Sequence, residues 1–193
     1  KLVLRQSGLS TIMRARRLAM LLSSLEQTQF KSVELEQYAT HGDLAARWLI
    51  DIHSFGDMQE GCKVADLGSG NGAIGLGALS LGASEAILVE ADPMALEIAR
   101  RNAEEMGFAD SIQIIQAMLG TDPVNIDYAD LIISNPPWGR QSPKADRPFL
   151  DAILSSQIIS HIMHSAEASH IETLFEGEGW SVERYGEADF ALP

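Results

Sequence analysis

The sequence predicts an α/β fold, with a mostly parallel sheet and helices on both of its faces. Helical stretches at residues 73–81, 94–107, 147–156 and 167–177 alternate with short apolar runs at 63–67, 86–90, 112–116, 131–134, 158–163 and 180–182. A glycine-rich turn follows the first run, and an Asn-Pro-Pro turn follows the fourth. Because strands that alternate with helices form parallel sheets, we expect ligands at the carboxyl ends of these strands.

Two further helices are expected before the first strand. Residues 10–25 and 42–55 carry apolar side chains at helical spacings, with Trp48, Leu49 and Ile52 on one side of the second segment. No repeat or linker-like stretch divides the chain. We therefore predict one domain over residues 1–193, made of an N-terminal helical extension (1–58) and a sheet-containing core (59–193).

Composition excludes several classes of protein. With 46% hydrophobic residues, the 193-residue chain can fill one core. Cys62 is the only cysteine, so no intramolecular disulfide and no Cys/His zinc cluster is expected. His161 and His164 lie three residues apart on a predicted strand and so point to opposite faces, which also disfavours a metal site. No run is long and apolar enough for a membrane span, and a cytoplasmic protein is expected.

The charge distribution bears on possible partners. The net charge of −13 disfavours a broad nucleic-acid surface, because phosphate binding depends largely on lysine and arginine. The basic residues Lys1, Arg5, Arg14, Arg16 and Arg17, however, precede every acidic residue. This segment is either a local phosphate-binding surface or the solvated face of a helix in an acid-rich protein.

Residues 64–72 read VADLGSGNG and predict a strand that runs into a ligand-binding turn. Glycines permit positive φ angles and let the backbone approach a ligand closely. Asp66 would orient the turn or bind an amino group of the ligand. The expected cofactor-binding residues here are Asp66, Gly68, Ser69, Gly70, Asn71, Gly72 and the first helical residue, Ala73.

An acidic residue ends the second apolar run. Glu90 follows Gly72 by eighteen residues, where a carboxylate can accept hydrogen bonds from a ribose diol. The pair suggests an adenosine ligand. NAD would favour a GxGxxG turn, whereas this turn reads GxGxG and resembles motif I of class I methyltransferases. We therefore expect S-adenosyl-L-methionine (SAM) as the cofactor.

The fourth predicted strand runs directly into the tetrapeptide NPPW, residues Asn135, Pro136, Pro137 and Trp138. The Asn135 side-chain oxygen and the Pro136 carbonyl can accept both hydrogens of a planar NH2 group, and Trp138 can stack on the ring that bears it. The alternative is a simple turn that closes a strand. The position of NPPW beside the expected cofactor favours a catalytic role.

Four motifs carry a family resemblance: LEQYAT (35–40), DLGSGNG (66–72), residues 95–105 and NPPWG (135–139). Together they resemble the archaeal and eukaryotic small-subunit ribosomal RNA adenine-N6 methyltransferases, over about residues 18–165. The resemblance implies a Rossmann-like class I methyltransferase sheet. It also implies that Gln37 and Thr40 close over SAM, that Gly68, Gly70 and Asn71 hold its methionine part, and that Glu90 holds its ribose. LEQYAT alone is also compatible with an N-cap region, with Thr40 capping the next helix.

Two features depart from this family. Met118 and Leu119, which we expect at the cofactor, stand where an acid usually meets the adenine of SAM. Either the lost hydrogen bond weakens SAM binding or Asp122 substitutes for that acid. The sequence also stops before the strand that usually completes the sheet.

The leading functional prediction is methylation of adenine N6 in ribosomal RNA. The alternatives are glutamine-N5 methylation of a release factor, which uses the same amino-group chemistry, and a cofactor-binding subunit without activity. The resemblance further implies a heterodimer with a small zinc-containing activator protein. The apolar strand at 112–115 should lie at the sheet edge and could accept a strand from that partner, unless the N-terminal helix covers it.

Overall fold

The computed structural model describes residues 7–27, 40–139 and 142–188, with side chains from residue 14 onward. The helices are α1 (Ser7–Ser23), α2 (Gly42–Phe55), α3 (Ala73–Ser80), α4 (Pro93–Met106), α5 (Arg147–Ser156) and α6 (Ser169–Gly177), with a 3-10 turn at Ala109–Ser111. The strands are β1 (Lys63–Leu67), β2 (Glu85–Glu90), β3 (Ile112–Gln116), β4 (Leu131–Ser134) and β5 (Ser160–Ile162). This order confirms the predicted α/β class.

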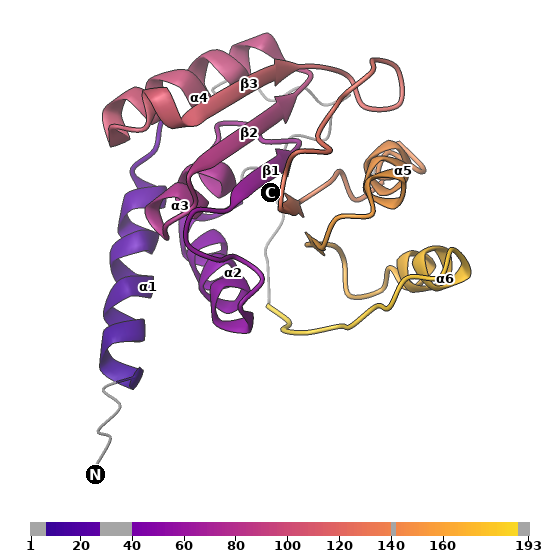
Figure 1. Cartoon of the computed structure of the whole chain (residues 1–193), viewed down its shortest axis with the longest axis horizontal. Helices are drawn as coiled ribbons and strands as arrows, with labels where there is room; N and C mark the ends of the chain where they lie inside the picture. Colours follow the sequence, from indigo (N-terminus) through magenta and orange to yellow (C-terminus); the bar gives the residue numbers. More distant parts are fainter. Residues whose placement is uncertain (1–6, 28–39, 140–141, 189–193) are drawn as a thin grey trace.

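The described strands form one parallel sheet in the order β3-β2-β1-β4-β5. The chain moves outward from β1 to β3, then crosses back to place β4 on the other side of β1. Figure 1 shows the resulting twisted sheet. The crossing makes the carboxyl ends of β1 and β4 a topological switch point, where open α/β sheets bind ligands.

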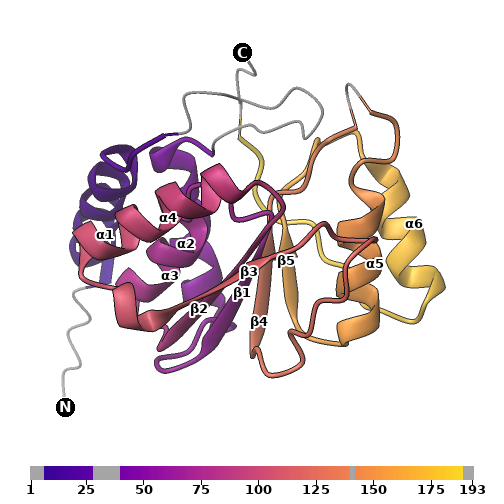
Figure 2. The ribbon, with the colours of Figure 1, turned by 90° about the horizontal axis from the view of Figure 1, so that it is seen from above.

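Helices cover both faces of this sheet, as Figure 2 shows, with α1 to α4 on one side and α5 and α6 on the other. Successive strand residues therefore enter different cores: Val64 packs among the residues of the first face, and Ala65 among those of the second. Both residues are fully buried. Because both faces are covered, the strands read as continuous apolar runs and not as alternating ones.

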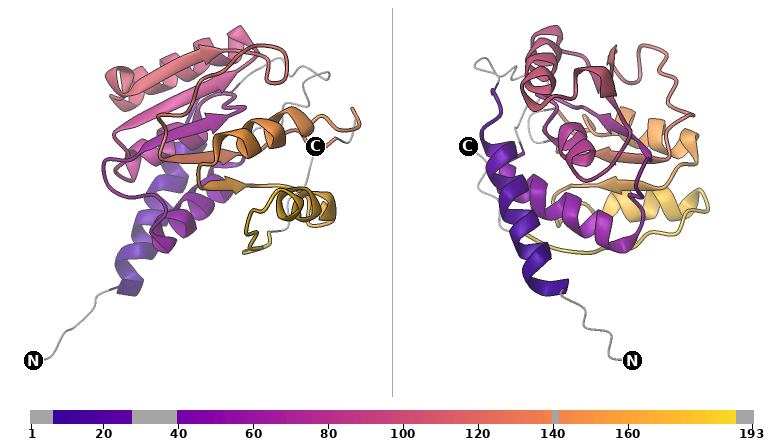
Figure 3. Two further views of the ribbon diagram at one scale, coloured as in Figure 1. Left: turned by 45° about the vertical axis from the view of Figure 1, so that its right-hand side comes forward. Right: turned by 60° about the vertical axis from the view of Figure 1, so that its left-hand side comes forward.

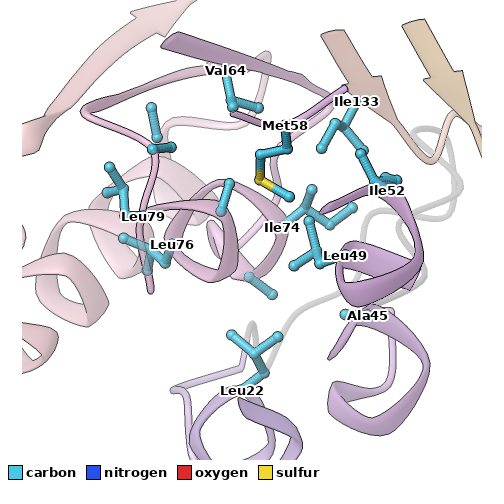
Figure 4. Close-up of a cluster of buried hydrophobic side chains, with 14 of the residues drawn as sticks. Leu22, Ala45, Leu49, Ile52, Met58, Val64, Ile74, Leu76, Leu79 and Ile133 are labelled. Atoms are coloured by element: carbon cyan, nitrogen blue, oxygen red, sulfur yellow. The ribbon is translucent and has the colours of Figure 1, made fainter. Parts of the chain in front are cut away.

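The N-terminal helices belong to the first of these cores. Leu22 of α1 and Leu49 of α2 pack with Leu76 of α3, as the close-up in Figure 4 shows. A Cβ at Gly77 would lie 2.4 Å from the Leu49 side chain, so glycine permits this close helix contact. Figure 3 shows α1 alongside α2, away from β3.

One predicted strand is wrong. Residues 180–182 form no strand, because the backbone N–H of Trp180 donates to the carbonyl of Phe175 at the end of α6. The Trp180 ring then packs edge-on against the Phe175 ring. The apolar residues of this segment are used for packing on the core of the second face and not for pairing in the sheet.

Among the described residues, no helix combines the length and apolar character that crossing a membrane requires.

Candidate active site

Most of the predicted site residues that the structure describes lie at the carboxyl ends of β1, β2 and β4. The glycine-rich turn follows β1, Glu90 ends β2, and Asn135 follows β4. The hydroxyl of Ser134 donates to the carbonyl of Leu67 at 2.8 Å, which joins the ends of β4 and β1. The two most informative motifs of the sequence thus lie on neighbouring strands.

The turn after β1 depends on its glycines. Gly68, Gly70 and Gly72 have φ angles of 76°, 53° and 84°, in the region that other residues rarely adopt. Gly68 also has no room for a side chain, since a Cβ would lie 2.9 Å from the Phe149 ring of α5. Phe149 forms a wall of this turn that the sequence did not reveal.

Asp66 lies fully buried beneath the turn. Its Oδ2 accepts a hydrogen bond from the Gly75 amide at 2.9 Å. Its Oδ1 has no hydrogen-bond partner in the described part of the chain, and neither does Oγ of Ser69, which is also buried. Burial raises the pKa of Asp66 to about 7, and the nearby charge of Glu90 adds to this rise. These two buried oxygens can accept hydrogen bonds from a ligand ammonium group.

Glu90 closes the other side of the turn. Its Oε2 accepts from the Gly70 amide at 2.9 Å, while Oε1 accepts from the amides of Ala91 and Asp92 at 2.9 and 3.1 Å. These bonds hold the carboxylate at the end of β2. An ionised carboxylate has about four acceptor positions, so capacity for a ligand hydroxyl remains.

Asn71 points away from the centre of the site. Its amide nitrogen donates to the carbonyl of Glu26 at 3.0 Å. The buried Asn102 of α4 donates to the carbonyls of both Asn71 and Glu26, at 3.0 and 3.2 Å. Asn102 therefore ties the turn to the segment after α1, a role that only the folded chain reveals.

Met118 is exposed after β3, and Leu119 is partly buried beside it. The Met118 amide donates to Oδ2 of Asp122 at 2.8 Å, and the Asp122 amide returns a bond to the Met118 carbonyl. The carboxylate of Asp122 therefore lies next to the backbone of Met118, at the position where the family that this sequence resembles usually has an acid.

The NPPW motif is held through its asparagine. Nδ2 of Asn135 donates to Oγ1 of Thr40 at 2.9 Å, and Nε1 of Trp138 donates to Oδ1 of Asn135 at 3.2 Å. Pro136 is buried and Pro137 half-buried. Thr40 does not cap α2, since the N-cap residue is His41 and no side chain forms a cap bond there. Gln37 lies outside the described residues, and Ala73 begins α3.

Comparison with known proteins places this site in a family. Residues 39–157 match the model of the methyltransferase small domain. The chain belongs to this methyltransferase family.

Its relatives share most of its length. The methyltransferase is 29% identical to the rRNA N(6)-adenosine-methyltransferase METTL5 of Danio rerio, over 94% of its own chain and 89% of that protein. It is 30% identical to the uncharacterised protein MJ0284 of Methanocaldococcus jannaschii, over 94% and 85% of the two chains. The crystal structure of the proposed RNA methyltransferase PH1948 from Pyrococcus horikoshii superposes with a TM-score of 0.76 at 36% identity, covering 86% and 83%. The protein is a class I SAM-dependent methyltransferase.

The buried oxygens of this methyltransferase fit SAM. Asp66 and Ser69 offer acceptors without partners, as the ammonium group of the methionine part requires. Gly70 leaves open space beside them, since no atom lies within 4 Å of the position that a Cβ would take there, and Glu90 ends β2, where the ribose of an adenosine ligand would be expected. When bound, SAM would supply an electrophilic methyl group on a sulfonium.

Proposed function

We propose that this methyltransferase transfers the methyl group of SAM to an exocyclic amino nitrogen, and that its acceptor is adenine N6 of ribosomal RNA. The observation that carries the proposal is the side chain of Asn135, which hydrogen bonds hold in place beside the glycine-rich turn that follows β1. Thr40 and Trp138 bind opposite ends of its amide group. This arrangement supports an acceptor role for the Asn135 oxygen.

The proposed chemistry needs acceptors and no charged base. The lone pair of an adenine amino group is delocalised into the ring, and hydrogen bonds to Asn135 Oδ1 and the Pro136 carbonyl would favour a more tetrahedral nitrogen. With SAM bound, the nitrogen would take the methyl group from the sulfonium, S-adenosylhomocysteine would leave, and the methylated amino group would lose one proton to water. Holding both reactants in line supplies much of the rate.

The Asn135 oxygen already accepts the Trp138 indole N–H. A carbonyl oxygen has two lone pairs, so it can accept an amino hydrogen as well. The indole bond therefore fixes the direction of the remaining lone pair. In this arrangement Trp138 orients the acceptor asparagine, in addition to stacking on the base.

The similarity to the rRNA N(6)-adenosine-methyltransferase METTL5 supports RNA as the substrate. Arg14, Arg16 and Arg17 of α1 are exposed or nearly so, and they form no ion pair with another described residue. They can contact phosphates on a protein whose net charge is −13. The same net charge disfavours a broad RNA-binding surface, and this favours the second candidate, glutamine-N5 methylation of a release factor.

Labelled SAM distinguishes these acceptors. We expect label in small-subunit ribosomal RNA and none in a GGQ-containing release factor when both are offered separately. Digestion to nucleosides should place the label in N6-methyladenosine. Label in the protein alone would refute the RNA proposal. Cofactor binding without transfer to either acceptor would support the subunit without activity.

We also propose that β3 receives a small zinc-containing activator protein. β3 is the terminal strand of the described sheet, and Ile112, Ile114 and Ile115 are only partly buried. The main contacts of α1 are with α2 and α3, so α1 leaves this edge uncovered. A partner strand would satisfy its backbone groups. Hydrogen exchange of residues 112–115 should slow when the activator is added, and full protection in an active monomer would contradict this proposal.

A further inference from the structure

Three side chains from the α5, β5 and α6 region meet next to the NPPW motif. Asp146 precedes α5, His164 follows β5, and His170 lies in α6. Nε2 of His170 lies 2.6 Å from Oδ2 of Asp146, and Nε2 of His164 lies 3.3 Å from the same oxygen. The side chains of His164 and Asp146 are 7% and 8% exposed, whereas that of His170 is 55% exposed.

His164 is the member that contacts the proposed acceptor site. Its ring stacks on the indole of Trp138, with centroids 5.9 Å apart and an angle of 24° between the planes. On another side, the ring of His170 meets His164 edge-on at 5.6 Å. Stacked and edge-on rings at these separations attract each other beyond their simple burial.

The hydrogen bonds of His164 define its protonation. Its Nδ1 accepts a bond from the Ser165 amide at 2.8 Å, so in the neutral ring the proton is on Nε2 and faces Asp146. Burial lowers the pKa of His164, which favours this neutral form. The 3.3 Å contact with Asp146 does not have the geometry of a hydrogen bond, so the carboxylate orients the ring mainly by charge.

The same three residues also have the composition of a metal site, with ligand atoms within 4.8 Å of one another. A metal on Nε2 of His164 would require the ring proton to be on Nδ1. That nitrogen already accepts the Ser165 amide. The hydrogen bonding of His164 therefore favours an orienting role over coordination.

We propose that His164, oriented by Asp146, is a positioning residue that sets the plane of Trp138 for binding of the methyl acceptor. A continuous series of contacts runs from Asp146 through His164 and Trp138 to Asn135. Rotation of the indole would move the N–H that holds the Asn135 oxygen. The proposal rests on the amino-group transfer described above, and it assigns His164 no contact with SAM.

Steady-state kinetics test the effect on the acceptor. Loss of one aromatic contact of about 0.5–1.5 kcal/mol corresponds to a change of about two- to tenfold. For His164→Ala, we expect KM for the acceptor to rise by about that factor, while calorimetry gives an unchanged Kd for SAM. His164→Phe keeps an aromatic ring against Trp138 and should recover most of the loss.

His170→Ala is the comparison variant, because it removes the contacts of His170 with Asp146 and with the edge of the His164 ring but keeps the His164 ring that stacks on Trp138. Its KM for the acceptor should change less than that of His164→Ala. Equal effects of the two substitutions would show that the stack of His164 on Trp138 does not by itself set KM, and would overturn the proposal.

A second measurement needs no acceptor. The chain has three tryptophans, so Trp48→Phe with Trp180→Phe leaves Trp138 as the only indole. In this protein, His164→Ala should increase quenching of Trp138 fluorescence by acrylamide and lower its anisotropy, and His164→Phe should not. Unchanged quenching would refute the positioning role even if RNA methylation is established. If no RNA is methylated but quenching changes, the function fails and the positioning role stands.

Calorimetry with zinc alone tests the competing assignment. We expect that His164 contributes nothing to zinc binding, so wild type and His164→Ala should give the same zinc titration. Zinc binding that depends on all three side chains would replace the positioning role by a metal site.

Discussion

Nδ2 of Asn135 donates a hydrogen bond to Oγ1 of Thr40 at 2.9 Å, across 95 positions of the sequence. The indole N–H of Trp138 can only donate, so it requires the amide oxygen on its side, and Nδ2 is left to donate to the Thr40 hydroxyl, which could bond to either end. An amide can rotate by half a turn at little steric cost, and only its hydrogen bonds distinguish the two orientations. Trp138 therefore orients the group on which the proposed chemistry depends, and Thr40 anchors its other end.

Replacing Thr40 tests how much its hydrogen bond to the Asn135 amide contributes. Thr40→Val keeps the shape of the side chain but removes the acceptor oxygen. We expect kcat/KM to fall about tenfold, since a net hydrogen bond contributes about 1 kcal/mol and more when its partner is left unpaired. Thr40→Ser, which keeps the hydroxyl, should stay close to wild type. Equal losses in both variants would indicate that only the packing of Thr40 matters.

Asn135 itself should be essential for transfer. Asn135→Ala removes the proposed acceptor of the amino hydrogens, so methyl transfer should fall below detection in a radiometric assay. Calorimetry should show that the affinity for SAM stays within a few fold, because Asn135 is assigned to the methyl acceptor. Turnover at the wild-type rate would remove Asn135 from the mechanism.

Glu90 should act on the cofactor. Glu90→Ala removes the acceptors of three backbone amides of the site and the proposed partner of the ribose. Charge-assisted hydrogen bonds of this kind contribute about 1–3 kcal/mol, so the Kd for SAM should rise by about one to two orders of magnitude. Glu90→Gln, which keeps the shape and an oxygen, should lose less. An unchanged Kd in the alanine variant would exclude Glu90 from the site.

The pKa of Asp66 predicts a pH dependence of stability. Burial raises this pKa from 3.8 to about 7 in the folded protein, so between these values the folded chain holds a proton that the unfolded chain has lost. The contribution of Asp66 to the free energy of unfolding therefore decreases as the pH rises from about 4 to 7, and then stays constant. Urea unfolding should show wild type losing stability relative to Asp66→Asn over this range. A difference that does not change with pH would contradict the raised pKa.

Tyr185 should stabilise the C-terminal segment. Its hydroxyl accepts from Nε1 of Trp48 at 2.9 Å and contacts Nδ1 of His161. The other ring nitrogen of His161, Nε2, lies 3.1 Å from Oδ2 of Asp57. Burial raises the pKa of Tyr185 to about 12, so the phenol keeps its proton at neutral pH and can donate to His161. Tyr185→Phe would leave both partners unpaired and should lower the free energy of unfolding by about 1–3 kcal/mol.

Tyr128 is the control for this substitution. Its hydroxyl also makes one side-chain hydrogen bond, to Gln113, but the residue is 39% exposed. Water can replace that bond, so Tyr128→Phe should change the free energy of unfolding by less than about 0.5 kcal/mol. Similar losses in the two variants would refute the network around Tyr185.

Local patterns were sufficient for the fold class and for the two motifs of the site. Buried parallel strands produce continuous apolar runs, and positive φ angles require glycine, so both features are visible in a short stretch of sequence. The structure has the glycine turn at residues 68–72 directly after β1 and the NPPW residues 135–138 directly after β4, where the sequence predicts them; their roles in binding and transfer stay predictions. Whether a single side chain binds a metal, a cofactor or a substrate depends on residues that are distant in the sequence, so a short stretch of sequence does not show it.

The prediction at residues 180–182 was wrong because a short apolar run fits several environments. Trp180 and Val182 pack against the core of the second face, and no neighbouring strand accepts their backbone groups. Whether an apolar segment becomes a strand depends on a partner that lies elsewhere in the chain.

The sequence by itself determined that β1 ends in a glycine-rich turn and β4 in an Asn-Pro-Pro turn, because those turns depend on residues that are adjacent in the chain. Only the tertiary structure decided what orients them. Thr40 reaches Asn135, Asn102 reaches the glycine turn, and His164 reaches Trp138. These contacts join residues brought together by the order of the strands and the packing of the helices, and hydrogen bonds and ring stacking over such separations leave no periodic signal in the sequence.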